Sequence, residues 1–168
     1  MKNFVVVGAL ALSVACGGGK NVRATGDVTT PEWVQLGTGA FTLEAGKQMH
    51  GVGSATGPDA KTRRQNADAA AQQQMAGGVT ALAGSFTKMS EQTGDSVGNA
   101  IADICNKAAT QAAAIRDHWV TPDGTEQALD VLDLQAFKAA LQNVDGDDKL
   151  KHEMTANAEK AFDSLMRQ

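Results

Sequence analysis

The sequence predicts an α+β domain whose antiparallel sheet is built from two hairpins and covered by long helices. Two turn signals predict the hairpins, because residues 44–47 and residues 121–125 each separate two short runs with strand character. Apolar residues at helical spacing predict the helices in the segments that follow each hairpin. The expected order is therefore two strands, two helices, two strands and two helices.

The first hairpin follows a segment, residues 17–30, that is rich in Gly and Thr and lacks apolar periodicity. The folded part is expected to begin at residues 31–34, and strands are predicted at residues 40–43 and 49–55. The stretch Gly57-Pro58-Asp59 then ends the strand and begins a helix, because Pro is tolerated in a first helical turn and Asp favours the helix N-terminus.

The first long helix is predicted from residue 59 to residue 90. Its apolar residues form one stripe at alternating spacings of four and three: Met75, Val79, Leu82, Phe86 and Met89. Fewer than three heptads are present, so an amphipathic helix that covers a sheet is favoured over a coiled-coil seam. The helix also contains Gly77, Gly78 and Gly84, each of which costs about 1 kcal/mol relative to Ala. They permit close approach of another backbone or mark a kink, and the sequence leaves both interpretations open.

The second helix is predicted at residues 97–112, after a break at residues 94–96, and it is rich in Ala. In the strand that follows, residues alternate between two faces, with Ile115, Asp117 and Trp119 on one and Arg116, His118 and Val120 on the other. The turn Pro122-Asp123-Gly124 leads into a returning strand at residues 127–134.

A short helix at residues 134–142 and a last helix after residues 144–147 complete the expected elements. The last helix carries a second apolar stripe: Leu150, Met154, Ala158, Ala161 and Leu165. A stripe of this size needs burial, either in the protein's own core or on a partner. We favour the protein's own core.

The N-terminus has the pattern of a secretory signal. Lys2 is followed by an apolar run at residues 4–14, which is too short for a transmembrane helix of about 20 residues. The stretch Ser13-Val14-Ala15-Cys16 resembles the lipobox of bacterial lipoproteins, with Ser13 where that motif usually has Leu. The resemblance implies that Cys16 is acylated and becomes the first mature residue. The alternative is a buried N-terminal element in which the cysteine is incidental.

The predicted organisation is a signal peptide at residues 1–15, a lipid-anchored flexible linker at 16–30, an α+β domain at 31–142 and a C-terminal helix at 143–168. Gly17 after the cysteine favours, by analogy with lipoproteins, sorting to the outer membrane. The lipid would then hold the domain at that membrane, facing either the periplasm or the outside.

The charge of the chain bears on nucleic-acid binding, and its cysteine content bears on disulfide formation. The formal net charge is −4, and Arg63-Arg64 is the largest basic cluster, so a nucleic-acid partner is not expected. If Cys16 carries lipid, Cys105 is the one remaining thiol and has no partner for an internal disulfide. Its neighbours Ile101, Ile104 and Ala108 favour a buried structural cysteine over a reactive or intermolecular one.

Three patterns in the sequence partly match binding-site motifs but lack required residues or spacing. Residues 51–57 are rich in Gly between a strand and a helix, but the parallel unit of a dinucleotide site is missing, so these glycines are assigned to the turn. Residues 145–148 resemble the start of a calcium loop, but Lys149 and Ala156 occupy two ligand positions, which favours a helix-capping linker.

The three histidines, His50, His118 and His152, lack the short spacing of a metal site. No nucleophile elbow is present either. The sequence therefore predicts a protein that is not an enzyme, with no catalytic residues, no metal ligands and no cofactor.

Together, these features resemble the bacterial lipoprotein family named for a twenty-kilodalton membrane-associated antigen, which includes flagellum-associated outer-membrane lipoproteins. The residues that carry the resemblance, besides the lipobox, are Pro31-Glu32-Trp33, residues 50–55, residues 66–76, Asp117-His118-Trp119-Val120, Asp123-Gly124-Thr125 and residues 129–134. The chain departs from the family at residues 69–74, where members often carry Arg, and at Gln127, where they carry an aromatic residue. The resemblance implies a non-enzymatic envelope lipoprotein and supplies no catalytic residues.

Two main hypotheses for function follow. The first is a lipid-anchored scaffold or assembly factor that binds envelope proteins, with self-association as one form of such contact. The second is a lipoprotein that binds a small molecule or a glycan on a sheet face around Trp33, His118 and Trp119. A hydrolase with an unrecognised site is a third, weaker alternative. A concave pocket lined by Trp119 would favour ligand binding, whereas a filled core beside a flat apolar patch would favour a protein partner.

Overall fold

The computed structural model describes residues 29–166, so the predicted signal peptide, Cys16 and nearly all of the predicted linker lie outside the described residues. The elements are α1 (Glu32–Leu36), β1 (Gly39–Leu43), β2 (Gly46–Ala55), α2 (Ala60–Met89), α3 (Asp95–Ala112), β3 (Ala114–Val120), β4 (Glu126–Asp133), α4 (Leu134–Asn143) and α5 (Asp148–Met166). The predicted α+β class and the order of its strands and long helices are confirmed. The short helix α1 is an addition, in the segment where the folded part was expected to begin.

The four strands form one antiparallel sheet in the order β1-β2-β4-β3. Each hairpin pairs its own two strands, and β2 and β4 then pair to join the hairpins. Gly46, with φ at 112°, and Gly124, with φ at 86°, adopt the left-handed backbone that these two turns require. The predicted turns are therefore confirmed. β2 and β4 are the two central strands of the sheet, and β1 and β3 are its edges.

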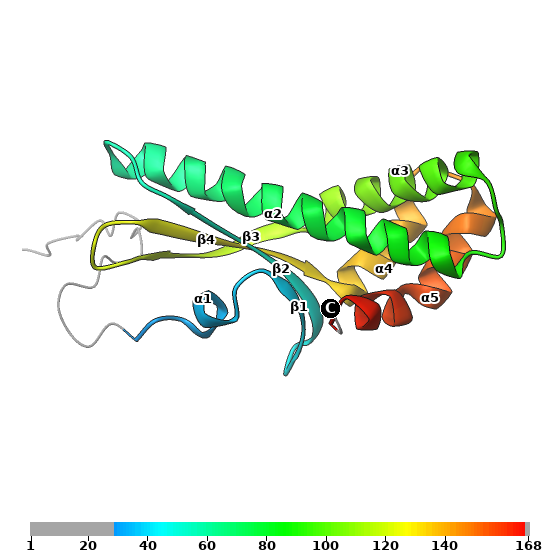
Figure 1. Ribbon diagram of the computed structural model, residues 1–168, viewed down its shortest axis with the longest axis horizontal. Coiled ribbons are helices and arrows are strands. Elements are labelled where there is room, and N and C mark those ends of the chain that lie inside the picture. The colour runs from blue at the N-terminus through cyan, green and yellow to red at the C-terminus, as the bar shows by residue number, and fades with distance from the viewer. Residues whose placement is uncertain (1–28, 167–168) are drawn as a thin grey trace, which may run out of the picture.

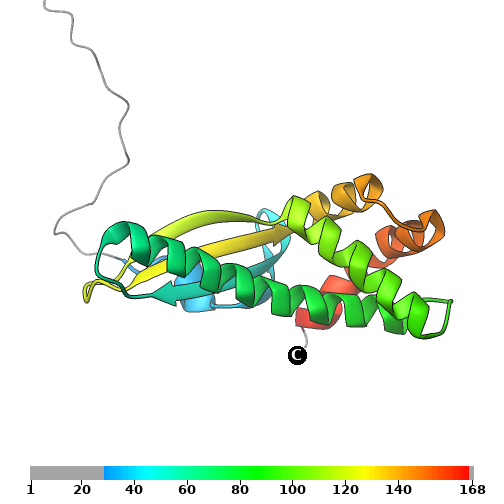
Figure 2. The same cartoon turned by 90° about the horizontal axis from the view of Figure 1, so that it is seen from above.

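The helices are divided unequally between the two faces of the sheet. Figure 1 shows α2 along one face and α1 on the opposite face. The first half of α2 lies over the strands, and its second half extends beyond them among α3, α4 and α5 (Figure 2). The result is an elongated domain with a sheet at one end and a bundle of helices at the other.

Helix α2 begins where the sequence predicts, because the Asp59 side chain accepts a hydrogen bond from the Thr62 backbone N–H at 2.9 Å. The predicted stripe is buried from Met75 to Phe86, and Ala67 and Ala71 extend it toward the N-terminus at a spacing of four. The interpretation as an amphipathic helix that covers a sheet is thus confirmed for the first half. The second half packs against helices instead.

The glycines of β2 bring α2 unusually close to the sheet. A Cβ added to Gly53 would lie 2.5 Å from the Ala67 carbonyl oxygen and would also overlap the backbone of Ala71. A Cβ added to Gly51 would lie 2.7 Å from the Met75 backbone nitrogen. The assignment to the turn holds for Gly57, which lies between β2 and α2, but it is wrong for Gly51 and Gly53. They lie within the strand, and they lack side chains because a helix backbone occupies that space.

The main core is formed by the bundle and the near half of the sheet. Phe137 of α4 lies between two other rings, 6.2 Å from Phe86 of α2 and 6.0 Å from Phe162 of α5, measured between ring centroids. Within α5, Leu150, Met154, Ala158, Ala161 and Phe162 are all buried. The C-terminal helix therefore belongs to the core of the domain, as favoured from the sequence.

Cys105 lies in this core and is fully buried. Its Sγ lies 3.8 Å from the Val79 carbonyl oxygen, to which it donates a weak hydrogen bond. Burial raises the pKa of the Cys105 thiol to about 12, because the thiolate would lose its hydration. The expectation of a buried structural cysteine is confirmed.

This burial predicts slow chemistry at Cys105. In a Cys16→Ser chain, which keeps Cys105 as its one thiol, native protein should react with a thiol reagent at least about a hundredfold more slowly than protein in denaturant, since reaction requires opening of the core. A stopped-flow or absorbance assay with an aromatic disulfide measures both rates. Comparable rates in the two states would contradict the buried position.

Candidate functional site

The two tryptophans meet on the face of the sheet opposite α2. Trp33 of α1 is buried against Leu129 and Val131 of β4, and Trp119 of β3 is partly buried beside the same group. The Trp33 Nε1 donates a hydrogen bond of 2.9 Å to an Asp117 carboxylate oxygen. This hydrogen bond ties α1 to β3 and fixes the helix on the sheet.

His118 lies on the other face, away from the tryptophans, because side chains alternate along β3 and His118 stands between Asp117 and Trp119. β3 also contains a bulge between Ile115 and Asp117. The extra residue, Arg116, shifts the alternation of side chains by one position. Ile115 packs with the Ala67 and Ala71 side chains under α2, while Asp117 bonds to Trp33 on the opposite face. The prediction that Ile115 shares a face with Asp117 and Trp119 is therefore wrong.

The His118 ring connects β3 to α2 through both of its nitrogens. Nδ1 lies 2.8 Å from an Arg64 guanidinium nitrogen, and Nε2 lies 2.5 Å from an Asp68 carboxylate oxygen. Because a guanidinium can only donate, Nδ1 must accept, and the ring proton is assigned to Nε2, which donates to Asp68. Both nitrogens are thus engaged, so the geometry leaves neither free to act as a base or a metal ligand.

A groove of about 330 Å³ lies on the helical side of the domain, between α2 and α3 and above the start of β3 and the middle of β4. Its apolar lining comes from Met75, Val79, Ala109, Ala113 and Ala114. Its polar lining comes from Gln72, Asn106 and Thr110, which are exposed, and from Asp130. The volume falls at the lower end of the range of about 300–1,000 Å³ that is common for small-ligand pockets.

Asp130 is the one charged residue in the lining of this groove, and it is only 4% exposed. It lies opposite Gly51 and Ile115 in the sheet, so its side chain points to the face that α2 covers. Among residues 29–166, no basic side chain forms an ion pair with Asp130. A carboxylate in this position is largely withdrawn from water without a close counter-charge.

Burial is the main influence on the titration of Asp130, and it raises the pKa of this carboxyl. The Val131 backbone N–H and the Arg116 charge lower the pKa, while the Asp68 charge raises it. The balance of these influences disfavours the charged form relative to an exposed aspartate.

This groove was not predicted, although the sequence carries a signal for it. The end of α3 and the start of β3 are rich in Ala and lack a large side chain that could fill the space beside Met75. Asp130 interrupts an apolar strand between Leu129 and Val131, both of which are buried. An acidic residue at the centre of a strand that is buried on both faces is uncommon and indicates a special environment.

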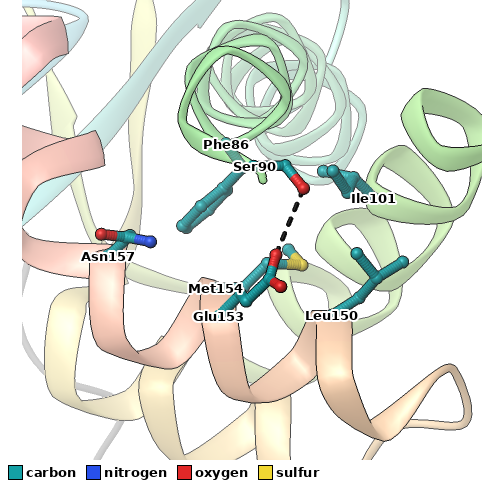
Figure 3. Close-up of a pocket in the computed structure, with 7 residues that line it drawn as sticks. All are labelled: Phe86, Ser90, Ile101, Leu150, Glu153, Met154 and Asn157. Carbon is teal, nitrogen blue, oxygen red and sulfur yellow. Dashed lines mark hydrogen bonds between the residues drawn. The ribbon is translucent and has the colours of Figure 1, made fainter. Parts of the chain in front are cut away.

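A much smaller cavity, of about 10 Å³, lies in the helical bundle between the end of α2, α3 and α5 (Figure 3). The Ser90 hydroxyl donates a hydrogen bond of 3.2 Å to one Glu153 oxygen, and the other Glu153 oxygen is buried with no hydrogen-bond partner among the described residues. A cavity of this size holds about one water molecule. It is a place for a bound water that completes the hydrogen bonding of Glu153.

The structure also describes the histidines and the acidic stretch that partly match metal-site motifs. Within residues 29–166, no three His, Cys, Asp or Glu side chains are grouped to hold a metal ion. The acidic stretch at residues 145–148 joins α4 to α5, and an Asp147 oxygen accepts a hydrogen bond of 2.9 Å from the Leu150 backbone N–H. The interpretation of this stretch as a helix-capping linker is confirmed.

Within the same described part of the chain, no helix combines the length and apolar character needed to cross a membrane. The lipid anchor at Cys16 lies outside the described residues and stays a prediction. So does the candidate ligand site at Trp33, His118 and Trp119, of which the structure brings the two tryptophans together and places His118 on the opposite face. No family model matches the chain, and no curated protein or solved structure matches it either. The resemblance to the twenty-kilodalton lipoprotein family accordingly stays a prediction from the residues.

Proposed function

We propose that this protein is a non-enzymatic, lipid-anchored envelope lipoprotein that binds another envelope protein through the α1 face of the sheet. We define the α1 face as the side formed by α1 and by the outward side chains Val52, Ser54, Trp119 and Gln127. The proposal combines the anchor expected at Cys16 with the sheet face that carries the short helix α1.

The observation that carries the proposal is the unequal cover of the two sheet faces. Helix α2 runs along one face, and α3, α4 and α5 lie at one end of the sheet, whereas the five-residue helix α1 is the only helix among residues 29–166 that lies on the other face (Figure 1). Val34, Val52 and Trp119 are only partly buried there, around the buried Trp33. A shallow apolar patch that contains a tryptophan and has polar residues at its edge is typical of a protein contact surface.

The edges of the sheet favour contact through side chains over addition of a partner strand. β3 carries a bulge and the exposed charged residues Arg116 and Asp117, two features that discourage pairing with another strand. At the other edge, β1 is only five residues long, and Thr42 contacts Met166 of α5. A partner is therefore expected to lie across the α1 face.

The position of α1 in the chain also fits an anchored protein. α1 is the first described element, and it is separated from Cys16 by residues 17–31. A fully extended chain of that length spans about 50 Å, at about 3.3–3.6 Å per residue. A lipid on Cys16 would thus keep the α1 face within reach of proteins embedded in the same membrane.

A ligand site around Trp119 is the alternative function. The two cavities described above are lined by neither tryptophan, and Trp33 fills the space against Leu129 and Val131. A filled cluster of this kind favours a protein partner over a small molecule or a glycan at this position.

Site-specific photocrosslinking in intact cells tests the proposal. A benzophenone side chain placed at Ser54, which is exposed on the α1 face, should give a crosslinked adduct with another envelope protein. The same side chain at Gln73, which is exposed on the outer side of α2, is the matched control and should give at least tenfold less adduct. Mass spectrometry of the adduct distinguishes a different protein from a second copy of this chain.

The anchor is tested in the same experiment with Cys16→Ser. This variant should leave the membrane fraction and lose most of the Ser54 adduct, because the domain is no longer held near its partner. Equal adducts from Ser54 and Gln73, or no adduct from Ser54, would argue against the α1 face. A Cys16→Ser chain that remains with the membranes as the wild type does would argue against the anchor.

A further inference from the structure

We propose that the groove between α2 and α3 is a binding site for a small organic cation, with an ammonium group on Asp130 and an apolar body against the alanine-rich lining of the groove. The site lies on the helical side of the sheet, opposite the α1 face. It is therefore separate from the protein contact proposed above, and the two can be tested independently.

The unpaired carboxylate points to a cation. Asp130 is 4% exposed and lines the groove, and no basic side chain among residues 29–166 forms an ion pair with it. Burial of a carboxylate without a counter-charge is costly, and a cation bound beside it recovers much of that cost. The charges of Arg116 and Asp68 shift the pKa of Asp130 in opposite directions, and Arg116 forms no ion pair with it.

The lining favours an organic cation over a metal ion. A hard metal ion needs several oxygen ligands, and Asp130 is the one carboxylate among the lining residues. The Val79 and Met75 side chains on α2, Ala109 on α3 and Ala113 directly after α3 offer an apolar surface beside the carboxylate. An ammonium group attached to a short hydrocarbon body matches both parts of this surface.

The size and the opening of the groove set the size of the ligand. About 330 Å³ is enough for a molecule of roughly the size of a phenylalkylamine, at the small end of common ligand pockets. Gln72, Asn106 and Thr110 stand at the exposed margin and can donate or accept hydrogen bonds to a polar group at the far end of the ligand. The groove thus has one charged end, an apolar middle and a polar margin.

Binding of phenethylammonium chloride to the full chain at pH 7 tests the proposal, with 2-phenylethanol as a neutral probe of nearly the same shape. We expect saturable NMR shifts of the Ala109 and Ala113 methyl groups with phenethylammonium, and at least tenfold weaker binding of 2-phenylethanol. Asp130→Asn should weaken the binding of phenethylammonium at least tenfold, which corresponds to about 1.4 kcal/mol. Asn has the shape of Asp and no charge, so the variant should keep the fold.

Two further variants separate the groove from general effects of charge and folding. Asp103→Asn makes the same change of charge at an exposed position of α3 outside the groove and should leave the affinity unchanged. Ala76→Phe places a large side chain at the exposed mouth of the groove and should abolish binding while the protein stays folded. Equal affinity for the two probes, unchanged affinity in Asp130→Asn, or an equal loss in Asp103→Asn would overturn the proposal. Absence of saturable shifts with phenethylammonium would do the same.

Discussion

A chain that ends at Asn143 is expected to lose its cooperative unfolding transition, because it lacks the whole of α5. That helix buries Leu150, Met154 and Phe162 in the main core. Burial of each such side chain stabilises a protein by about 1.5–3 kcal/mol, and the total stability of a domain is only about 5–15 kcal/mol. The expected loss is therefore comparable with the total. Far-UV circular dichroism during urea titration measures it.

A chain that ends at Met166 keeps all of α5 and serves as the matched control, with an expected urea midpoint equal to that of the wild type. Phe162→Ala provides a finer test, because removal of this nearly inaccessible ring, which contacts Phe137, should cost about 3–5 kcal/mol. If the chain ending at Asn143 unfolds cooperatively at the wild-type midpoint, α5 does not belong to the core. Loss of self-association from such a folded chain would identify α5 as an interface.

Gly53→Ala is expected to destabilise the protein by about 3 kcal/mol or more, although it adds a single methyl group. The new Cβ would lie 2.5 Å from the Ala67 carbonyl oxygen and 2.6 Å from the Ala70 carbonyl carbon. Both are backbone atoms of α2, so no side-chain rotation can relieve the overlap, and the helix must move away from the sheet. Overpacking that shifts the backbone typically costs about 1–3 kcal/mol and occasionally more, and this site falls at the upper end because only backbone can move.

The matched control is Gly77→Ala, the same substitution within α2 itself. A Cβ at Gly77 meets nothing within 4 Å, so the substitution removes a flexible residue from a helix interior and should stabilise the protein by about 0.5–1 kcal/mol. The two variants are thus expected to shift the urea midpoint in opposite directions. A Gly53→Ala midpoint at or above that of the wild type would show that α2 does not lie as close to β2 as described.

Local sequence patterns predict which residues share a face of a helix, but not which element that face packs against. The apolar stripe of the last helix predicted that its residues share a face, and the burial of Leu150 and Met154 confirms it. Helical periodicity identifies a face because it depends only on the spacing of residues along one element. What that face packs against is decided by other elements, so placing α5 against Phe137 of α4 required the tertiary structure.

The candidate sites also contain features that the sequence predicted and features that only the structure reveals. The proximity of Trp33 and Trp119 was part of the predicted site, but His118 lies on the other face, where it bonds to Asp68. A bulge at Arg116 also places Ile115 on the face opposite Asp117 and Trp119, against the predicted alternation. A single inserted residue reverses which face of the sheet the side chains on either side of it point to, so simple alternation assigns some of them to the wrong face. Composition gives little sign of such a shift, and the pairing with β4 reveals it.

By itself, the sequence determined the α+β class, the order of the strands and long helices, the turn at residues 121–125 and the start of α2 at Asp59. Each of these follows from interactions between residues close in the chain, such as turns, caps and apolar periodicity. Only the tertiary structure decided the role of Gly53 and the existence of the groove beside Asp130. The physical reason is that the distance between two packed elements, and the space left between them, depend on the summed sizes of side chains from both.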